Sequence, residues 1–162
     1  MKSSIRARSA VGGAFVVLAL VTAVGASGRN LDDGDEGGGD VLRATLVPSA
    51  SGDAAINGVS PAGDWRLRRG SVRIERDGEL RVDLSRLVPR ATGRNESGAS
   101  VRAALYCSGT RADVTRSERL SRRGDARIRD ELNAPRRCLA PTVLVQPSGN
   151  DRVFVAVNGF VD

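Results

Sequence analysis

The sequence predicts an all-β fold, an antiparallel β-sandwich of about seven or eight strands held by one disulfide bond. Three observations lead to this prediction. Short runs of alternating apolar and polar residues recur every ten to fifteen residues, with turn-forming residues between them. No apolar pattern of helical spacing and useful length follows the N-terminal region. The chain has only two cysteines, Cys107 and Cys138, which an exported domain would use as one disulfide.

Residues 1–26 are predicted to be an export signal. The positively charged start MKSSIRAR precedes an uncharged apolar run over residues 11–24, and small residues follow it. This order is typical of a cleaved secretory signal peptide. The alternative is a retained membrane anchor, because the small residues after Val24 could lengthen the apolar run. We favour cleavage, which predicts a secreted or cell-surface protein with no stable membrane span.

Residues 27–40 are predicted to be a flexible acidic linker. The stretch RNLDDGDEGGGD, residues 29–40, has five carboxylates, four glycines and a single leucine. It therefore offers too little apolar surface to offset the entropy of ordering. A calcium loop is the alternative, but the glycine and glutamate positions of an EF-hand are missing. One folded domain is expected over residues 41–162.

The predicted strands follow one another along this domain. TVLV and VFVAV are apolar on both faces and are placed in the centre of the fold, whereas the arginine-rich runs should have one face in water. The runs are VLRATLV (41–47), LRRGSVRIER (67–76), ELRVDLSRLV (79–88), ASVRAALYC (99–107), RADVTRSERL (111–120), ARIRDEL (126–132), PTVLVQ (141–146) and RVFVAVNGF (152–160).

The stretch SVRIERDGELRVDL contains the clearest hairpin. Its Asp-Gly pair favours a two-residue turn, but that register would place Ile74 opposite Arg81 and mix apolar with charged side chains on one face. A three-residue loop over residues 76–78 instead sets Ile74 opposite Leu80. It also puts Gly78 in the left-handed conformation, which glycine adopts without steric cost. We predict the three-residue loop.

Cys107 and Cys138 are predicted to form a structural disulfide. Val101, Ala103, Leu105 and Cys107 share one face of their strand, so Cys107 should lie at the inner end of a core strand. The bond would tie it to the start of the TVLV strand and stabilise the fold by about 3–4 kcal/mol. A zinc site is a weak alternative because the chain has no histidine, and a redox pair would normally be CxxC.

The available side chains exclude most catalytic chemistry. Without histidine, Ser-His-Asp and Cys-His arrangements cannot form, and there is no GxSxG elbow or P-loop. A pair of carboxylates could still hydrolyse glycosides. Asp64, Glu75, Asp83 and Asp130 are candidates, but nothing in the sequence brings two of them together. We predict no enzyme activity, no cofactor and no metal site.

Arginine dominates the charge of the domain. From Val41 onward the chain has 21 arginines and 14 acidic residues, a net charge of +7. If clusters of arginines converge they would attract a polyanion. Because acidic residues interrupt each cluster, we favour a solvated, ion-paired surface instead. The candidate polyanion-binding residues are Arg66, Arg68, Arg69, Arg73, Arg119, Arg122, Arg123 and Arg127.

Two long loops rich in glycine and serine cover residues 49–64 and 89–100. Loops carry function more often than strands do. Trp65, the only tryptophan, closes the first loop; it is a possible ligand-stacking residue, although packing against the domain is the favoured interpretation. Asn95 begins an N-glycosylation sequon that is expected to be exposed, and relevant only where the host modifies such sites.

Four features together resemble small exported bacterial β-sandwich proteins of the CHRD-domain type: the export signal, the RIERDGELRVDL hairpin, the ALYCSGT strand and the closing VFVAVNGF strand. The resemblance covers most of residues 41–162 as a strand pattern and implies an immunoglobulin-like sandwich. Such domains usually carry histidines on the strand that ALYCSGT matches, and this chain has none. The resemblance therefore implies no metal role here and no functional residue.

The expected function is that of an exported, non-catalytic binding or structural module at the cell surface or in the medium. Its partner would be an unidentified extracellular ligand or protein. One alternative is a polyanion-binding module that uses the arginine clusters to hold an acidic wall polymer, a lipid or a nucleic acid. A second alternative is a carboxylate-dependent, carbohydrate-active enzyme.

Overall fold

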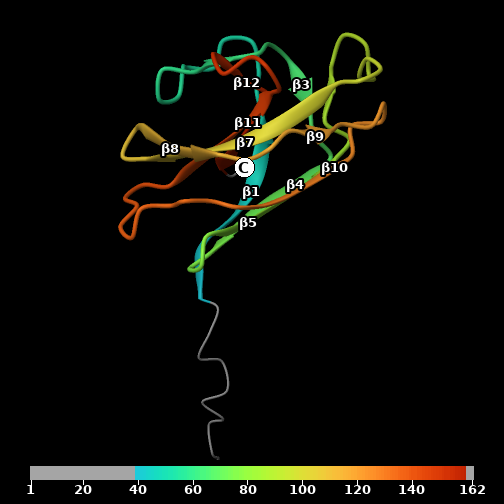
Figure 1. The fold of residues 1–162 in the computed structure, drawn as a ribbon. Helices are drawn as coiled ribbons and strands as arrows, with labels where there is room; N and C mark the ends of the chain where they lie inside the picture. Colours follow the sequence, from blue (N-terminus) through green and yellow to red (C-terminus); the bar gives the residue numbers. More distant parts are fainter. Residues whose placement is uncertain (1–38, 160–162) are drawn as a thin grey trace, which may run out of the picture. The chain divides into compact units, whose positions relative to one another are not determined.

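The structure, a computed structural model, describes residues 39–159, and these form strands joined by turns and loops (Figure 1). The predicted export signal, most of the predicted linker and the last three residues lie outside the described residues. Strand β1 begins at Asp40, one residue before the predicted start of the domain. Within residues 39–159 no helix is long and apolar enough to cross a membrane.

Each predicted run contains at least one strand. The longer strands are β1 (Asp40–Pro48), β4 (Arg69–Glu75), β5 (Glu79–Ser85), β7 (Ser100–Cys107), β8 (Thr110–Val114), β10 (Ala126–Glu131), β11 (Thr142–Pro147) and β13 (Ala156–Gly159). The two-residue strands are β2 (Ser60–Pro61), β3 (Trp65–Arg66), β6 (Val88–Pro89), β9 (Glu118–Arg119) and β12 (Val153–Phe154). The sequence predicts a loop over residues 49–64 that ends at Trp65, and the structure places β2 and β3 in this region.

The main sheet is antiparallel and curled, with the strand order β10-β5-β4-β1-β13-β11-β7-β8 and with β9 also paired to β7 (Figure 1). Strand β1 joins the two halves because Thr45 pairs with Ser71 of β4 on one side and with Gly159 of β13 on the other. The halves enclose one large apolar core, to which both β5 and β7 contribute. The predicted all-β, antiparallel fold is confirmed, and one continuous sheet provides both of its packed layers.

The β4–β5 hairpin has the predicted three-residue loop. Ile74 pairs with Leu80, and the N–H of Gly78 donates a hydrogen bond to the carbonyl of Glu75 at 3.1 Å. Gly78 has a φ of 95°, and a Cβ at this position would lie 2.5 Å from the carbonyl oxygen of Leu132. Glycine is therefore required twice, for its conformation and for its small size.

The central strands β7 and β11 are buried on both faces, whereas β13 is buried at Ala156 and half-buried beyond it. On β7, the side chains of Val101, Ala103 and Leu105 enter the large core, as the alternation predicts. The intervening Ala104 and Tyr106 pack into a second apolar cluster on the opposite face. Phe154 of β12 and Val59, the residue before β2, belong to that cluster, and Ile56 packs against it, so the 49–64 loop region contributes to the packing of the fold.

Candidate functional site

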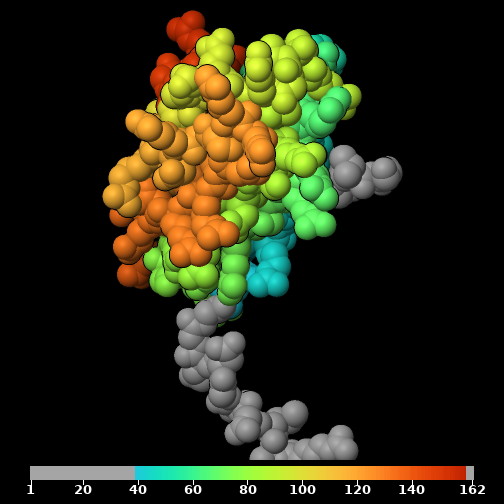
Figure 2. Space-filling model, turned by 90° about the vertical axis from the view of Figure 1, so that its right-hand side faces the viewer, coloured from blue at the N-terminus to red at the C-terminus, as the bar shows by residue number. Residues whose placement is uncertain are grey.

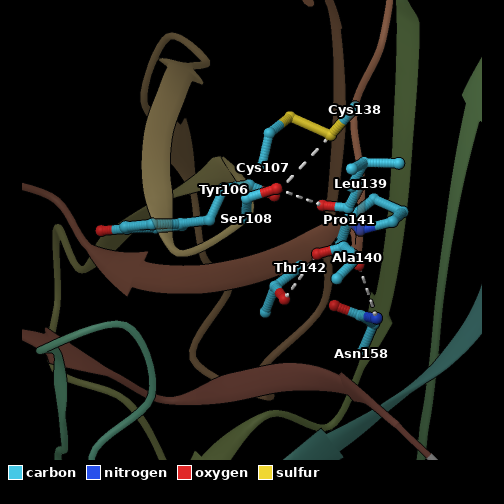
Figure 3. Close-up of a disulfide and its surroundings, with 9 residues drawn as sticks. All are labelled: Tyr106, Cys107, Ser108, Cys138, Leu139, Ala140, Pro141, Thr142 and Asn158. Atoms are coloured by element: carbon cyan, nitrogen blue, oxygen red, sulfur yellow. Dashed lines mark hydrogen bonds between the residues drawn. A yellow bond between two sulfur atoms is a disulfide. The ribbon is translucent and has the colours of Figure 1, made fainter.

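The predicted disulfide between Cys107 and Cys138 is confirmed, with 5.0 Å between the two Cα atoms (Figure 3). It joins the end of β7 to the connection that leads into β11. Next to it, the N–H of Ser108 donates to the carbonyl of Leu139 at 2.8 Å. Figure 3 shows the ring of Tyr106 pointing away from the sulfur atoms. The disulfide therefore cross-links two segments of the fold whose cysteines are 31 positions apart in the sequence.

The predicted arginines include two clusters on segments that adjoin the end of β4 and β5 opposite their hairpin loop. The first cluster is Arg66, Arg68 and Arg69, and the second is Arg119, Arg122 and Arg123. The N–H of Arg68 donates to the carbonyl of Ser85 at 3.0 Å, and the N–H of Leu87 donates to the carbonyl of Gly124 at 2.9 Å. The segment after β5 therefore lies between the two clusters. Figure 2 looks onto this side, where the segments around β3 (green), after β6 (yellow-green) and around β10 (orange) adjoin.

We call this region the arginine end. Its arginines are exposed and form no ion pair within the described residues, although Glu118 and Asp125 lie among them. Six of its seven arginines were predicted from the sequence as polyanion-binding residues, and the structure adds Arg86 to them. The arginine end consists of Arg66, Arg68, Arg69, Arg86, Arg119, Arg122 and Arg123.

The other two predicted polyanion-binding residues are ion-paired on the outer face of the sheet. Arg127 pairs with Asp83 at 2.7 Å. Arg73 pairs with Asp40 and lies 3.5 Å from the carboxylate of Glu75. The expected ion-paired surface therefore exists on the sheet face, whereas the arginine end is separate from it.

An ordered pattern of charge explains this difference. Arginines on β1, β4, β5 and β10 stand in register as a row across the sheet, and acidic residues form the neighbouring row. The arginine row is Arg43, Arg73, Arg81 and Arg129, and the acidic row is Asp40, Glu75, Glu79 and Glu131. Such adjacent rows neutralise each other across the strands.

The pKa values of Glu79 and Asp40 in the acidic row respond to this pairing. Arg81 donates to both carboxylate oxygens of Glu79, at 2.8 and 2.9 Å, and this hydrogen bonding lowers the pKa of Glu79. Desolvation alone would raise the pKa of Asp40, but hydrogen bonding and charge from Arg73, with help from Arg43, outweigh it and lower that pKa. Both carboxylates thus stay ionised as partners of arginine.

Three carboxylates gather at the β4–β5 hairpin, where ligand atoms of Glu75, Asp77 and Glu79 lie within 4.8 Å of one another. Asp77 accepts a hydrogen bond from the N–H of Glu79 at 3.0 Å, and the two glutamates face Arg81. Each carboxylate already has a partner within the hairpin. The cluster alone supports no metal assignment.

The four carboxylates considered for glycoside hydrolysis also have partners. Asp83 is paired with Arg127 and Glu75 belongs to the acidic row. Asp130 accepts hydrogen bonds from the backbone and side chain of Arg116. Asp64 accepts the N–H of Ser51 at 2.6 Å, a bond that lowers its pKa. Hydrogen bonds from Arg116 likewise lower the pKa of Asp130, so Asp64 and Asp130 are shifted in the direction opposite to that of a general acid.

Trp65 stands between two surface hollows next to the arginine end. It packs its apolar surface against the large core while remaining half-buried. One hollow, of about 580 Å³, lies toward Arg94 and Arg122. The other, of about 610 Å³, lies toward Asp64 and Arg90. Trp65 therefore combines the packing role and the surface position that the sequence left as alternatives.

Asn95 fixes the loop that forms the wall of the first hollow. Its side-chain amide donates to the carbonyls of Leu87 at 2.8 Å and Ser121 at 3.2 Å. Its backbone N–H donates to the carbonyl of Arg122 at 3.0 Å. Glu96 and Ser97 of the sequon are exposed as expected, but Asn95 is only 5% exposed, so the expected exposure is wrong for the asparagine itself. The amide nitrogen that would carry a glycan is already committed to backbone carbonyls.

Sequence reasoning missed Arg86, Arg90, Arg94 and Asn95 as parts of this region. Their isolated positions in glycine-rich or hydrophilic segments resemble those of any surface residue. Pro89 pairs with Trp65 in the structure, but a proline in the sequence argues against a regular strand, so it gave no signal for this pairing.

Comparison of the chain with protein-family models, curated proteins and solved structures finds no match. No family is therefore assigned to the chain.

Proposed function

We propose that this protein is an exported binding module that holds an anionic polymer at its arginine end. The supporting observation is the convergence of seven exposed arginines without ion pairs within the described residues. Guanidinium groups that are not held in ion pairs add to the positive potential of a surface and bind sulfate, phosphate or carboxylate groups strongly. The arginine row of the sheet serves as an internal contrast, because Arg43, Arg73 and Arg81 are ion-paired with acidic residues.

Export is part of the same proposal. The N-terminal sequence has the order of a signal peptide, and a disulfide between the only two cysteines suits an oxidising compartment. A binding role without catalysis fits the lack of histidine and the partnered carboxylates. The ligand would accordingly be a polyanion found outside the cell.

The proposal predicts salt-dependent binding to heparin that depends on where arginine is removed. The variant Arg68→Gln/Arg122→Gln removes two charges from the arginine end. In a plot of the logarithm of the affinity against the logarithm of the salt concentration, the slope of this variant should be smaller in magnitude by about two. Its affinity near physiological salt should fall about 10–50-fold. Fluorescence titration of the secreted chain over a salt series measures both quantities.

The matched control is Arg136→Gln/Arg137→Gln. These two arginines are also exposed and flank Cys138, near the other end of the hairpin. Strand β4 separates the two ends by about 20 Å. The control should bind heparin like the unchanged protein apart from a small effect of net charge. Equal losses in both variants, or salt-independent binding of the unchanged protein, would contradict a localised site.

A further inference from the structure

We infer that the anionic polymer is a polysaccharide of acidic sugars, and that Trp65 stacks on one of its rings. This inference rests on the proposed function, because it names the class of polymer held at the arginine end. It is carried by the two hollows beside Trp65 and by the chemistry of their walls.

The hollows form a pair that suits consecutive units of a chain. Trp65 and Pro89 line both of them, so the tryptophan stands at their shared boundary. Each hollow also has arginine in its wall: Arg94 and Arg122 in the first, Arg90 in the second. Their volumes, about 580 and 610 Å³, fall within the usual range for small-molecule sites of about 300–1,000 Å³. One ligand unit in each hollow would place an acidic group near an arginine and a ring near the indole.

The position of Trp65 is set before any ligand binds. The backbone N–H of Trp65 donates to the carbonyl of Ser49 at 2.9 Å. The backbone carbonyl of Trp65 accepts the Nε–H of Arg90 at 3.3 Å. In the first hollow, the wall that contains Asn95 is fixed by the hydrogen bonds of this buried side chain. A preformed site loses little conformational entropy on binding.

The other side chains in the first hollow favour a sugar. A pyranose ring has an apolar C–H face, which can cover an indole, and a rim of hydroxyl groups. Thr92, Glu96 and Ser97 line this hollow and can accept hydrogen bonds from such hydroxyls. Arg94 and Arg122 can bind a carboxylate or sulfate on the same ring. The wall thus offers partners for all three features of an acidic sugar.

Other polyanions use only part of this site. An inorganic polyphosphate has no ring for Trp65 and no hydroxyl groups to donate hydrogen bonds to Thr92, Glu96 and Ser97. A nucleobase would stack on the indole, but the residues that line the first hollow include no second aromatic ring to enclose the base. A nucleic acid is therefore an outcome of the test and is not the proposed ligand.

Because Trp65 is the only tryptophan, its fluorescence reports directly on this site. The secreted chain would be titrated with a heparin hexasaccharide, with inorganic polyphosphate and with oligo-dT of similar charge, each over a salt series. The hexasaccharide should change the tryptophan emission and bind at least tenfold more tightly than the other two probes. Trp65→Leu keeps apolar bulk against the core, and it should weaken hexasaccharide binding about tenfold with no change in the salt slope; calorimetry measures this variant.

A second variant keeps the test of the site valid if Trp65→Leu fails to fold. Arg94 is exposed on a loop, and Arg94→Gln should weaken hexasaccharide binding severalfold while reducing the salt slope by about one. Oligo-dT that binds as tightly as the hexasaccharide and changes the emission would overturn the sugar assignment in favour of nucleic acid. Equal binding of polyphosphate, with no effect of Trp65→Leu, would overturn the stacking role but leave the arginine end as a polyanion site. If none of the three probes binds in a salt-dependent way, the proposed function itself fails.

Discussion

At the scale of single residues, a few polar side chains hold the chain segments around the sheet. Asp130 on β10 accepts the N–H of Arg116 at 2.7 Å and its guanidinium at 3.1 Å. The side chain of Asp130 is mostly buried, with 15% exposed, whereas that of Arg116 is 85% exposed. The carboxylate therefore acts mainly as an anchor for the backbone between β8 and β9.

Replacing Asp130 by asparagine should lower stability in a pH-dependent way. The backbone and side-chain hydrogen bonds from Arg116 lower the pKa of Asp130 below its ordinary value of 3.8. Since the folded state favours the ionised carboxylate, its contribution is complete above that value and is lost as the pH falls through the folded-state pKa. Asp130→Asn should reduce the free energy of unfolding by about 1–2 kcal/mol at pH 7 and by much less near pH 2.5. Urea unfolding at both pH values measures the difference.

Asp83→Asn is the control for this experiment. Asp83 also pairs with an arginine, but its side chain is 54% exposed and that of Arg127 is 66% exposed. Exposed pairs contribute about 0–1 kcal/mol, so this variant should stay close to the unchanged protein. A loss in Asp130→Asn that is equally large at both pH values would argue against an ionised anchor.

At the scale of elements, the turn between β9 and β10 brings the arginine clusters together. Gly124 in this turn has a φ of 89° and packs directly on the backbone of Leu87, so that an added Cβ would collide with it. The same contact includes the hydrogen bond from the N–H of Leu87 to the carbonyl of Gly124. A glycine without a side chain thus sets how closely the two segments approach.

Gly124→Ala should be the more damaging of two similar substitutions. It combines an unfavourable backbone conformation with a collision, and should lower the free energy of unfolding by about 2–4 kcal/mol. Gly149 has a similar φ of 84°, but a Cβ there would have open space around it. Gly149→Ala should therefore cost only about 1–2 kcal/mol. Thermal and urea unfolding compare the two, and equal losses would show that the contact with Leu87 has little effect.

At the scale of the whole molecule, the disulfide and the arginine end lie at different ends of the curled sheet. The bond joins the end of β7 to the segment before β11, and the pocket beside Cys138 also includes the β4–β5 hairpin loop. The arginine end lies where Arg69 pairs with Ser85, at the far end of the same hairpin. Stability and binding should therefore be separable.

Cys107→Ala/Cys138→Ala tests this separation. Loss of the bond should lower the free energy of unfolding by about 3–4 kcal/mol, because the unfolded chain regains the freedom of a loop spanning 31 positions. Under conditions where the variant is folded, its affinity for heparin should match that of the unchanged protein. A large loss of heparin affinity in the folded variant would show that the two ends are coupled.

Local patterns were enough to predict the longer strands, the hairpin and the disulfide. Alternation with a period of two reports which side chains face the core, and it placed Leu105 and Cys107 on one face correctly. Matching apolar faces decided the register of Ile74 with Leu80 over the alternative turn. These features depend on residues close together in the sequence, or on the small number of possible cysteine partners.

The tertiary structure alone decided which charges are neutralised and which remain free. Arg73 and Arg68 look alike in the sequence, yet register across β1, β4 and β5 gives Arg73 acidic neighbours, whereas Arg68 lies outside the acidic row. The burial of Asn95 likewise depends on carbonyls of Leu87 and Ser121, which reach it only after the sheet has curled. Alternation along a strand carries no information on which distant strand will be its neighbour, and that choice set the arginine end apart from the sheet face.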